Sequence, residues 1–396
     1  MGIHVSPELG YVAVLFALFV IPRALQRFGV PAAITSLTLG AAAGLGFGLF
    51  RGDTTLHLLA AFGIVALFLF AGLDVDLRQL RTDGAVLLQH LVVRVVLLVG
   101  VTLVVRQVLG LEGRPATLLA LALLTPSTGF ILDSLGGLDL AENEKRWIRS
   151  KAIATELLAL LVLFGTLQST SIQRMGASLA VLIGMILFLP LVFRGFAALV
   201  APFAPRSEFA FLLMIAVICA FVTRELGVYY LVGAFVVGMA AQSFRTRLPS
   251  IASESMIHAV EMFASFFIPF YFFSAGLGIR REDLDLTSLA WGTGFLLAML
   301  PLRLSSVIVH RRLALKERGG QGLRIAVALL PTLVFGLVLA EILRDRFAVP
   351  PAIFGGVILY TLATTILPAL FFRRALADYA EPHAPRLEVE DLPPSE

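Results

Sequence analysis

Apolar runs separated by short polar segments follow one another along the whole chain. Several of these runs, such as 175–193, 226–244 and 347–372, contain no Asp, Glu, Lys or Arg. A helix of about 20 apolar residues crosses about 30 Å of hydrocarbon. Segments of about ten residues with alternating polarity, which transmembrane strands require, are absent from the sequence. The pattern predicts an all-α integral membrane protein.

We expect thirteen transmembrane helices, each ending where polar residues interrupt an apolar run. Their expected ranges are 8–22, 31–50, 56–73, 84–106, 115–134, 149–168, 175–195, 209–224, 228–244, 256–277, 286–309, 321–342 and 351–372.

Three pairs of landmarks recur in the same order, about 200 residues apart. Gly-Val opens an apolar run at residue 29 and at residue 227, Ala-Gly-Leu ends one at 71 and at 275, and Pro126 and Pro331 lie within apolar runs. Matching the landmarks shifts the pattern by seven helices, and an odd shift reverses the direction of crossing. We therefore expect two inverted six-helix repeats, about 8–168 and 209–372, joined by a linker helix at about 175–195.

Composition narrows the class of protein. The chain is 58% hydrophobic and 15% charged, with a mean hydropathy of +0.92, whereas a soluble domain has an apolar share of about 45–50%. Lys and Arg are concentrated in alternate loops, which predicts that the amino terminus lies outside the cell and the carboxyl terminus in the cytoplasm. The expected location is the inner (plasma) membrane of the cell. A transmembrane domain should span 1–374, followed by a short cytoplasmic tail at 375–396.

Pro126 and Pro331 occupy the middle of the fifth helix of each expected repeat. Proline removes a backbone donor and leaves a carbonyl unpaired, so each helix could be kinked and healed by hydroxyls, or broken. The symmetric placement favours two crossed broken helices. Hydroxyl side chains surround both prolines, and they are Thr125, Ser127, Thr128 and Thr332.

Glu156 is the candidate ion-binding residue. It lies about 10 Å beyond Arg149 along its helix, and a charge-free run follows it to residue 173. An acid at that depth is costly unless it faces a cavity or a partner. Because one carboxylate can hold either a proton or a cation, competition at Glu156 is sufficient for exchange.

Other charged residues have weaker claims. Arg303 lies deep in the eleventh helix, where it could pair with Glu156 or with the carboxyl end of a broken helix, or could form a structural salt bridge. Asp133 could attract cations into a cytoplasmic funnel, and His258 with Glu261 could sense pH, although a solvated helix end is the simpler account of Asp133 and a solvated face that of the pair.

Several segments resemble the monovalent cation:proton antiporters of the CPA2 group, which includes Kef potassium efflux systems and bacterial sodium/proton exchangers. The resemblance rests on Leu69–Leu77, Leu231–Gly238 and Phe272–Ile279. It implies a homodimer in which a core domain moves like an elevator past a dimerisation domain. It also implies an ion site formed by the broken fifth helix with Thr155 and Glu156, and a basic residue at Arg303. The family usually has Asp where this chain has Glu156.

The sequence therefore predicts exchange of K⁺ or Na⁺ for H⁺. The resemblance further implies electroneutral 1:1 stoichiometry, which is typical of members with a single carboxylate at this position. A sodium-coupled organic anion symporter of the same fold, or a transport-inactive channel or sensor, is the alternative. No cofactor, enzymatic activity or nucleic-acid partner is expected, since neither H-E-x-x-H, G-x-S-x-G nor G-x-G-x-x-G occurs and no basic run is interleaved with aromatics. The expected partners are monovalent cations, protons, lipid and a second copy of the chain, and a monovalent cation is the only metal expected.

Overall fold

The structure is a computed structural model that describes residues 7–50, 52–75, 80, 84–204, 207–244, 254–316 and 319–373. The expected tail at 375–396 lies outside these residues. All the regular elements that they form are helices.

The helices before the expected linker follow the predicted ranges closely. They are α1 (Pro7–Gln26), α2 (Ala32–Ala41) with the π-helical turn η1 (Ala42–Gly46), α3 (Thr54–Leu73), α5 (Gly84–Leu109), α6 (Gly113–Leu124), α7 (Thr128–Ser134) and α8 (Glu142–Gln168).

The remaining helices follow the predictions equally well. They are α9 (Ile172–Leu199), α10 (Glu208–Glu225), α11 (Tyr230–Phe244), α12 (Glu254–Leu277), the 3₁₀ turn η3 (Arg281–Leu284), α13 (Leu286–Leu315), α14 (Gly319–Ala328), α15 (Leu333–Phe347) and α16 (Pro351–Phe372).

Several helices extend beyond the predicted ends into polar sequence, among them α1, which ends at Gln26, and α15, which ends at Phe347. Helix α8 begins at Glu142 rather than at residue 149, because the Glu144 carboxylate accepts a hydrogen bond from the backbone N–H of Ala141 at 2.9 Å and caps the first turn. Helix α13 continues to Leu315, past residue 309. Apolarity marks the part of a helix that lies in lipid, whereas caps mark its true ends.

Nine helices among the described residues are long and apolar enough to cross a membrane, and α14 with α15 forms a further pair bent by 49°. Two apolar helices, Ala32–Gly46 and Tyr230–Ser243, are shorter. The chain is thus a multi-pass membrane protein, and its thirteen crossings remain a prediction.

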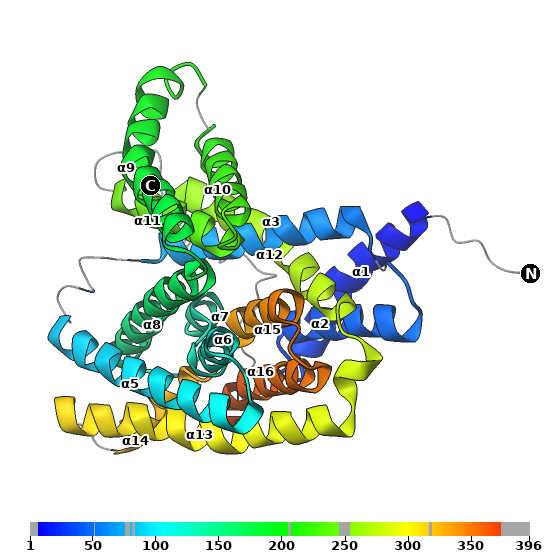
Figure 1. The fold of residues 1–396 in the computed structure, drawn as a ribbon. Coiled ribbons are helices and arrows are strands. Elements are labelled where there is room, and N and C mark those ends of the chain that lie inside the picture. The colour runs from blue at the N-terminus through cyan, green and yellow to red at the C-terminus, as the bar shows by residue number, and fades with distance from the viewer. Residues whose placement is uncertain are drawn as a thin grey trace, which may run out of the picture.

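Helices α2, α3, α11 and α12 pack closely because glycines lie where they meet (Figure 1). A Cβ atom on Gly72 of α3 would lie 2.3 Å from the carbonyl oxygen of Phe235 on α11, and one on Gly238 would lie 2.3 Å from that of Leu69. A Cβ atom on Gly276 of α12 would lie 2.0 Å from the oxygen of Leu37 on α2. Only glycine allows these backbones to approach so closely.

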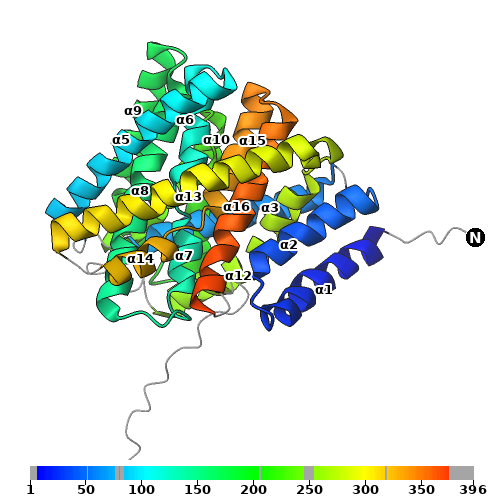
Figure 2. The ribbon, with the colours of Figure 1, turned by 90° about the horizontal axis from the view of Figure 1, so that it is seen from below.

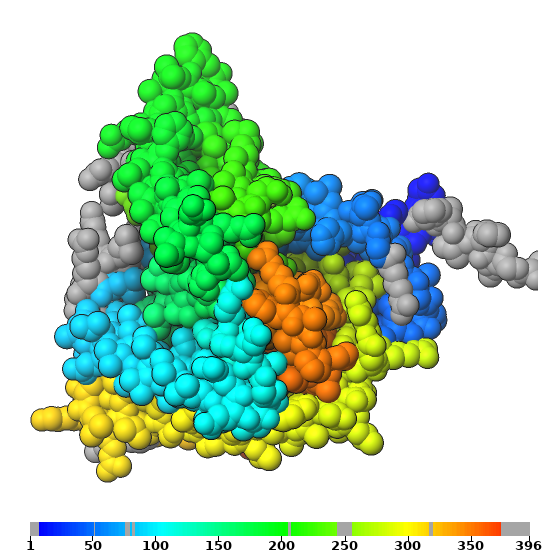
Figure 3. Space-filling view, in the orientation of Figure 1, coloured from blue at the N-terminus to red at the C-terminus, as the bar shows by residue number. Residues whose placement is uncertain are grey.

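A second group, α5–α8 with α13–α16, lies below α3, α11 and α12 in the view of Figure 1, and α2 is level with its upper helices. Helices α6 and α15 are almost wholly buried within it, whereas α5 and α13 run along its outer side, as Figure 2 shows. Helices α9 and α10 rise above the rest of the molecule as a ridge (Figure 3).

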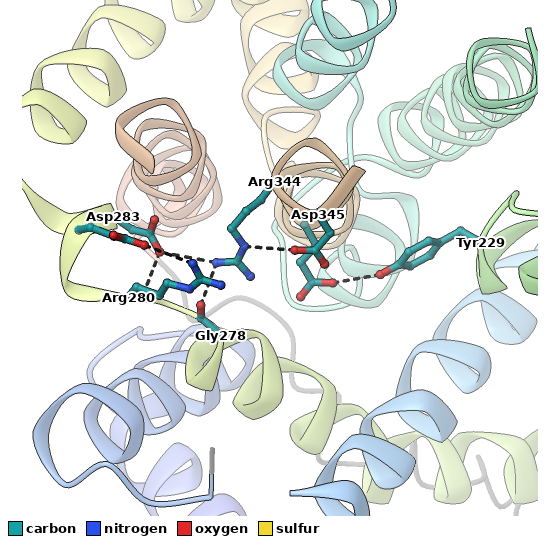
Figure 4. A network of polar contacts seen from close by, with 8 residues as sticks. Tyr229, Gly278, Arg280, Asp283, Arg344 and Asp345 are labelled. Atoms are coloured by element: carbon teal, nitrogen blue, oxygen red, sulfur yellow. Dashed lines mark hydrogen bonds and ion pairs between the residues drawn. The ribbon is translucent and has the colours of Figure 1, made fainter. Parts of the chain in front are cut away.

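Polar contacts join the two groups at one end (Figure 4). The hydroxyl of Tyr229, just before α11, donates to the carboxylate of Glu341 on α15 at 3.1 Å. The Arg344 guanidinium donates to the carbonyl of Gly278 at 2.8 Å and lies 3.6 Å from the Asp283 carboxylate. Helix α15 is therefore held to the other group by side chains as well as by packing.

Candidate ion-binding site

Two helix breaks meet in the interior of the second group. The first separates α6 from α7 at Thr125–Ser127, and the second separates α14 from α15. The backbone N–H of Ser127 donates to the carbonyl of Pro331 at 2.7 Å, and the Ser127 hydroxyl accepts from the N–H of Val334 at 3.3 Å. Each break therefore supplies hydrogen-bond partners for backbone groups that the other break leaves unpaired. Unwound segments inside a membrane need such partners.

Glu156 lies beside the first break. Its carboxylate accepts a hydrogen bond from the backbone N–H of Thr128 at 3.2 Å, and the residue is only 3% exposed. It occupies the middle of α8, a helix of 27 residues. A carboxyl group so enclosed is costly to ionise unless a cation or hydrogen-bond donors approach it.

Four of the hydroxyl residues expected at the site are buried in the structure. Thr125, Ser127 and Thr128 are buried at the break, and Thr155 is buried next to Glu156 on α8. The Thr155 hydroxyl donates to the carbonyl of Lys151 at 2.7 Å and lies 3.1 Å from Nε2 of His90 on α5. The structure thus places Thr128 in hydrogen-bond contact with Glu156, and Thr125 and Thr155 on one small cavity, while the Ser127 hydroxyl is bonded to the second break.

A small cavity of about 20 Å³ is lined in part by Arg94, Thr125 and Thr155. This volume is enough for about one water molecule. The space beside the break is therefore closed to a hydrated ion in this conformation.

Arg303 is buried, and its hydrogen bonds go to the carboxyl ends of the broken helices. Nη2 donates to the carbonyl of Leu329, just after α14, at 2.8 Å, and Nη1 donates to the hydroxyl of Tyr360 on α16 at 3.0 Å. That hydroxyl donates in turn to the carbonyl of Leu123 near the end of α6 at 2.7 Å. Of the partners that the sequence suggested for Arg303, its hydrogen bonds match the carboxyl end of a broken helix.

Sequence reasoning missed Tyr360, although a signal existed. It is the single tyrosine of the predicted helix 351–372, in a run that is otherwise apolar apart from threonines. A buried tyrosine hydroxyl needs a partner, and here it has one on each side.

Thr332 joins a second cluster of hydroxyls at the other break. Its hydroxyl lies 3.1 Å from that of Thr364 and 3.5 Å from that of Thr361, both on α16. All three residues are fully buried. Pro331, beside them, supplies the carbonyl that holds Ser127.

The residues considered for a funnel or for pH sensing lie apart from Glu156. Asp133 is half-buried on α7, a little more than one turn beyond Thr128. His258 and Glu261 lie 3.7 Å apart near the start of α12 and are partly exposed. Burial, the largest effect, raises the pKa of Asp74 to about 6, Arg149 opposes this shift, and Glu261 adds to it, so Asp74 is coupled to this cluster. Nothing in the sequence distinguishes Asp74 from the other loop acids.

Comparison with known proteins shows the family to which the chain belongs. The profile of the family described as "Sodium/hydrogen exchanger, transmembrane" matches residues 13–376. The chain belongs to this family of membrane transporters. The assignment to the monovalent cation:proton antiporters is thereby confirmed. The narrower assignment to the CPA2, Kef-type group is not, because the matching family is of the CPA1 type.

Individual relatives are distant but cover most of the chain. A curated relative is "Probable Na(+)/H(+) antiporter 3" of Methanocaldococcus jannaschii, 24% identical over 379 residues, which are 90% of this chain and 93% of the relative. A similar solved structure is the sodium proton antiporter MjNhaP1 from the same organism at pH 8, with a TM-score of 0.69 and 14% identity, covering 92% of this chain and 95% of that one. The latter likeness shows the fold.

Proposed function

We propose that this protein exchanges a monovalent cation for H⁺ with 1:1 electroneutral stoichiometry, and that Glu156 is the shared binding site for the two ions. The single observation that carries the proposal is the enclosure of Glu156 at the break between α6 and α7, within hydrogen-bond distance of Thr128. A carboxylate in this position binds either a proton or a cation, because either one neutralises a charge that burial makes costly.

We propose that oxygen atoms suited to a monovalent cation complete the site around this carboxylate. The hydroxyls of Thr125, Thr128 and Thr155, together with carbonyls released by the broken helix, are the proposed additional ligands. Ser127 has a positioning role, because its backbone N–H and hydroxyl are already bonded to the second break. Sodium is the first ion to test, since both relatives are named as sodium antiporters, and K⁺ is the second.

Arg303 compensates charge at the other side of the breaks. The carbonyl ends of α6 and α14 carry partial negative charge, and Arg303 reaches one directly and the other through Tyr360. Because both terminal nitrogens of Arg303 are engaged, its contacts favour this role over binding a substrate carboxylate, which an organic anion symporter would require.

Transport requires Glu156 to face each side of the membrane in turn. We propose that α5–α8 and α13–α16 form a core that moves like an elevator past a scaffold of α1–α3 and α10–α12, and that two scaffolds pair in a homodimer. The proposed orientation has the amino terminus outside and the carboxyl terminus in the cytoplasm.

The decisive experiment measures proton flux with a pH-sensitive dye in proteoliposomes. Addition of Na⁺, and separately of K⁺, should release protons in the wild-type protein but not in Glu156→Gln. Glu341→Gln is the matched control, since it makes the same change to another carboxyl group in a membrane helix, and it should retain exchange. Clamping the membrane potential should leave the wild-type rate unchanged.

Acidification should raise the KM for the cation, by up to about tenfold per pH unit once the site is mainly protonated, because both ions compete for one carboxylate. Exchange that persists in Glu156→Gln would remove Glu156 from the mechanism. Folded wild-type protein without any cation-dependent proton flux would refute antiport itself.

A further inference from the structure

A groove of about 680 Å³ lies between α5 and α13, on the side of the molecule away from α9 and α10. Its wall is mainly apolar, and at one end it becomes polar. The residues that line it are Gln89, Val93, Leu97, Leu302, Ser305, Ser306, Val309, His310, Leu313 and Ala314. None of these residues belongs to the candidate ion site.

The length and polarity of the groove match one leaflet of a bilayer. From Leu302 to Leu313 the helix rises about 16 Å, and half of the hydrocarbon thickness is about 15 Å. The apolar side chains of Val93, Leu97 and Leu302 lie towards the middle of the two helices, whereas Gln89 and His310 lie near the ends that emerge together. The groove can therefore take an acyl chain with its headgroup beside His310.

His310 offers a hydrogen-bond donor at the polar end. The residue is 7% exposed, its Nδ1 lies 3.2 Å from the ammonium nitrogen of Lys151, and its Nε2 has no hydrogen-bond partner among the described residues. A lysine ammonium only donates, so Nδ1 accepts and the neutral ring carries its proton on Nε2. A buried donor without a partner is costly. This nitrogen has almost no accessible surface, so the ring would have to turn towards the groove for a headgroup oxygen to accept from it.

The charge at this end of the groove is positive. Arg311 is buried next to His310, 5.4 Å over the ring of Trp147, and Arg312 and Lys316 are exposed at the end of α13. No acidic side chain lines the groove. This environment is complementary to a phosphate that carries a net negative charge, and less so to a zwitterionic headgroup.

We propose that the groove between α5 and α13 is a binding site for one anionic phospholipid, with an acyl chain against Val93, Leu97 and Leu302 and the phosphate near His310. In the proposed orientation this lipid belongs to the cytoplasmic leaflet. The site does not depend on the transport cycle, so it can be tested separately from antiport.

The test uses purified full-length protein in nanodiscs of phosphatidylcholine that contain a trace of phosphatidylglycerol with a photoreactive diazirine on its acyl chain. After illumination, labelled peptides are quantified by mass spectrometry. We expect labelling of α5 and α13 that excess unlabelled phosphatidylglycerol suppresses, and that the same excess of phosphatidylcholine does not suppress.

Two matched variants separate a bound lipid from the surrounding bilayer. Val93→Phe narrows the groove and should lower the competable labelling about tenfold, because added volume in a packed space forces neighbours apart. Val96→Phe makes the same change on the same helix at a side chain that is 65% exposed, and should leave labelling unchanged. His310→Gln should lower the preference for phosphatidylglycerol.

Equal labelling of the two phenylalanine variants would overturn the proposal, because the lipid would then be bulk bilayer. Equal suppression by both unlabelled lipids would refute the preference for an anionic headgroup. Crosslinks between two protein chains through α5 or α13 would assign the groove to a second copy instead. Elution as a single folded species, checked for each variant by size-exclusion chromatography, separates loss of binding from loss of folding.

Discussion

At the scale of single residues, the sequence alone identifies one key residue of the candidate site, Glu156, but not another, Tyr360. Glu156 stands out because it is a charge within an apolar run. Tyr360 is not conspicuous, since its importance arises from two carbonyl ends, near Leu123 and Leu329, that come together only in the folded chain. Residue type predicts which side chain needs a partner, but not which partner it finds.

Replacing Tyr360 with Phe should destabilise the protein by about 1–3 kcal/mol, because the change leaves the carbonyl of Leu123 and one nitrogen of Arg303 without a buried partner. Thermal unfolding in detergent would measure the loss. Tyr11→Phe is the control, since it removes a hydroxyl whose partner, Asp53, lies near the surface. An equal effect of the two changes would contradict a special role for the buried hydroxyl.

Asp74 should make stability depend on pH. Its pKa in the folded protein is raised to about 6, chiefly by burial and further by Glu261. The folded state therefore holds its proton more tightly than the unfolded state, so stability should fall as pH rises from about 4 to about 6 and change little above that. In Asp74→Asn this part of the profile should be flat.

The measurement for Asp74 is the unfolding temperature between pH 4 and pH 8, compared between wild type and Asp74→Asn. Asp345→Asn changes an exposed acid and should keep the wild-type profile. A profile that remains steep in Asp74→Asn would assign the pH dependence to other groups.

At the scale of helices, hydropathy predicts where the chain crosses the membrane and fails where polar caps extend a helix. The ranges predicted for α3, α12 and α16 agree with the observed helices within two residues at each end. The range predicted for α8 begins seven residues late, because a capping carboxylate rather than apolarity sets that end. The two prolines predicted both breaks, since a missing N–H has a local effect that needs no knowledge of the fold.

Replacing Gly72 with Leu should prevent α3 and α11 from packing, because even the first added carbon would overlap the backbone of Phe235 and Gly238. We expect little folded protein after extraction. Gly100→Leu is the matched control, because nothing lies within 4 Å of the Cβ position at Gly100. Similar yields of the two variants in fluorescence-detected size-exclusion chromatography would contradict the proposed constraint.

At the scale of the whole molecule, the repeat landmarks acquire a structural meaning. Gly72 on α3 contacts α11, and Gly276 on α12 contacts α2. Under the proposed correspondence of α2 with α11 and of α3 with α12, these two contacts are equivalent. This pairing supports the inverted repeat that we propose. Sequence comparison alone could align the glycines but could not indicate which helices they bring together.

If the two helix groups move past each other, the contact between Tyr229 and Glu341 must break in each cycle. A short thiol crosslinker between Tyr229→Cys and Glu341→Cys, in a chain with Cys219→Ser, should therefore stop exchange. Each single cysteine variant, treated in the same way, should still transport. Full exchange by the crosslinked protein would refute relative movement of the two groups.

The hydrogen bonds between the two breaks, from Ser127 to Pro331 and Val334, also limit how this transporter could be re-engineered. A chimera that takes only residues 125–128 from a relative with another ion preference would place the foreign loop against the original backbone at Pro331 and Val334. If the proposed site determines ion preference, a successful transplant should have to carry both loops together with Tyr360.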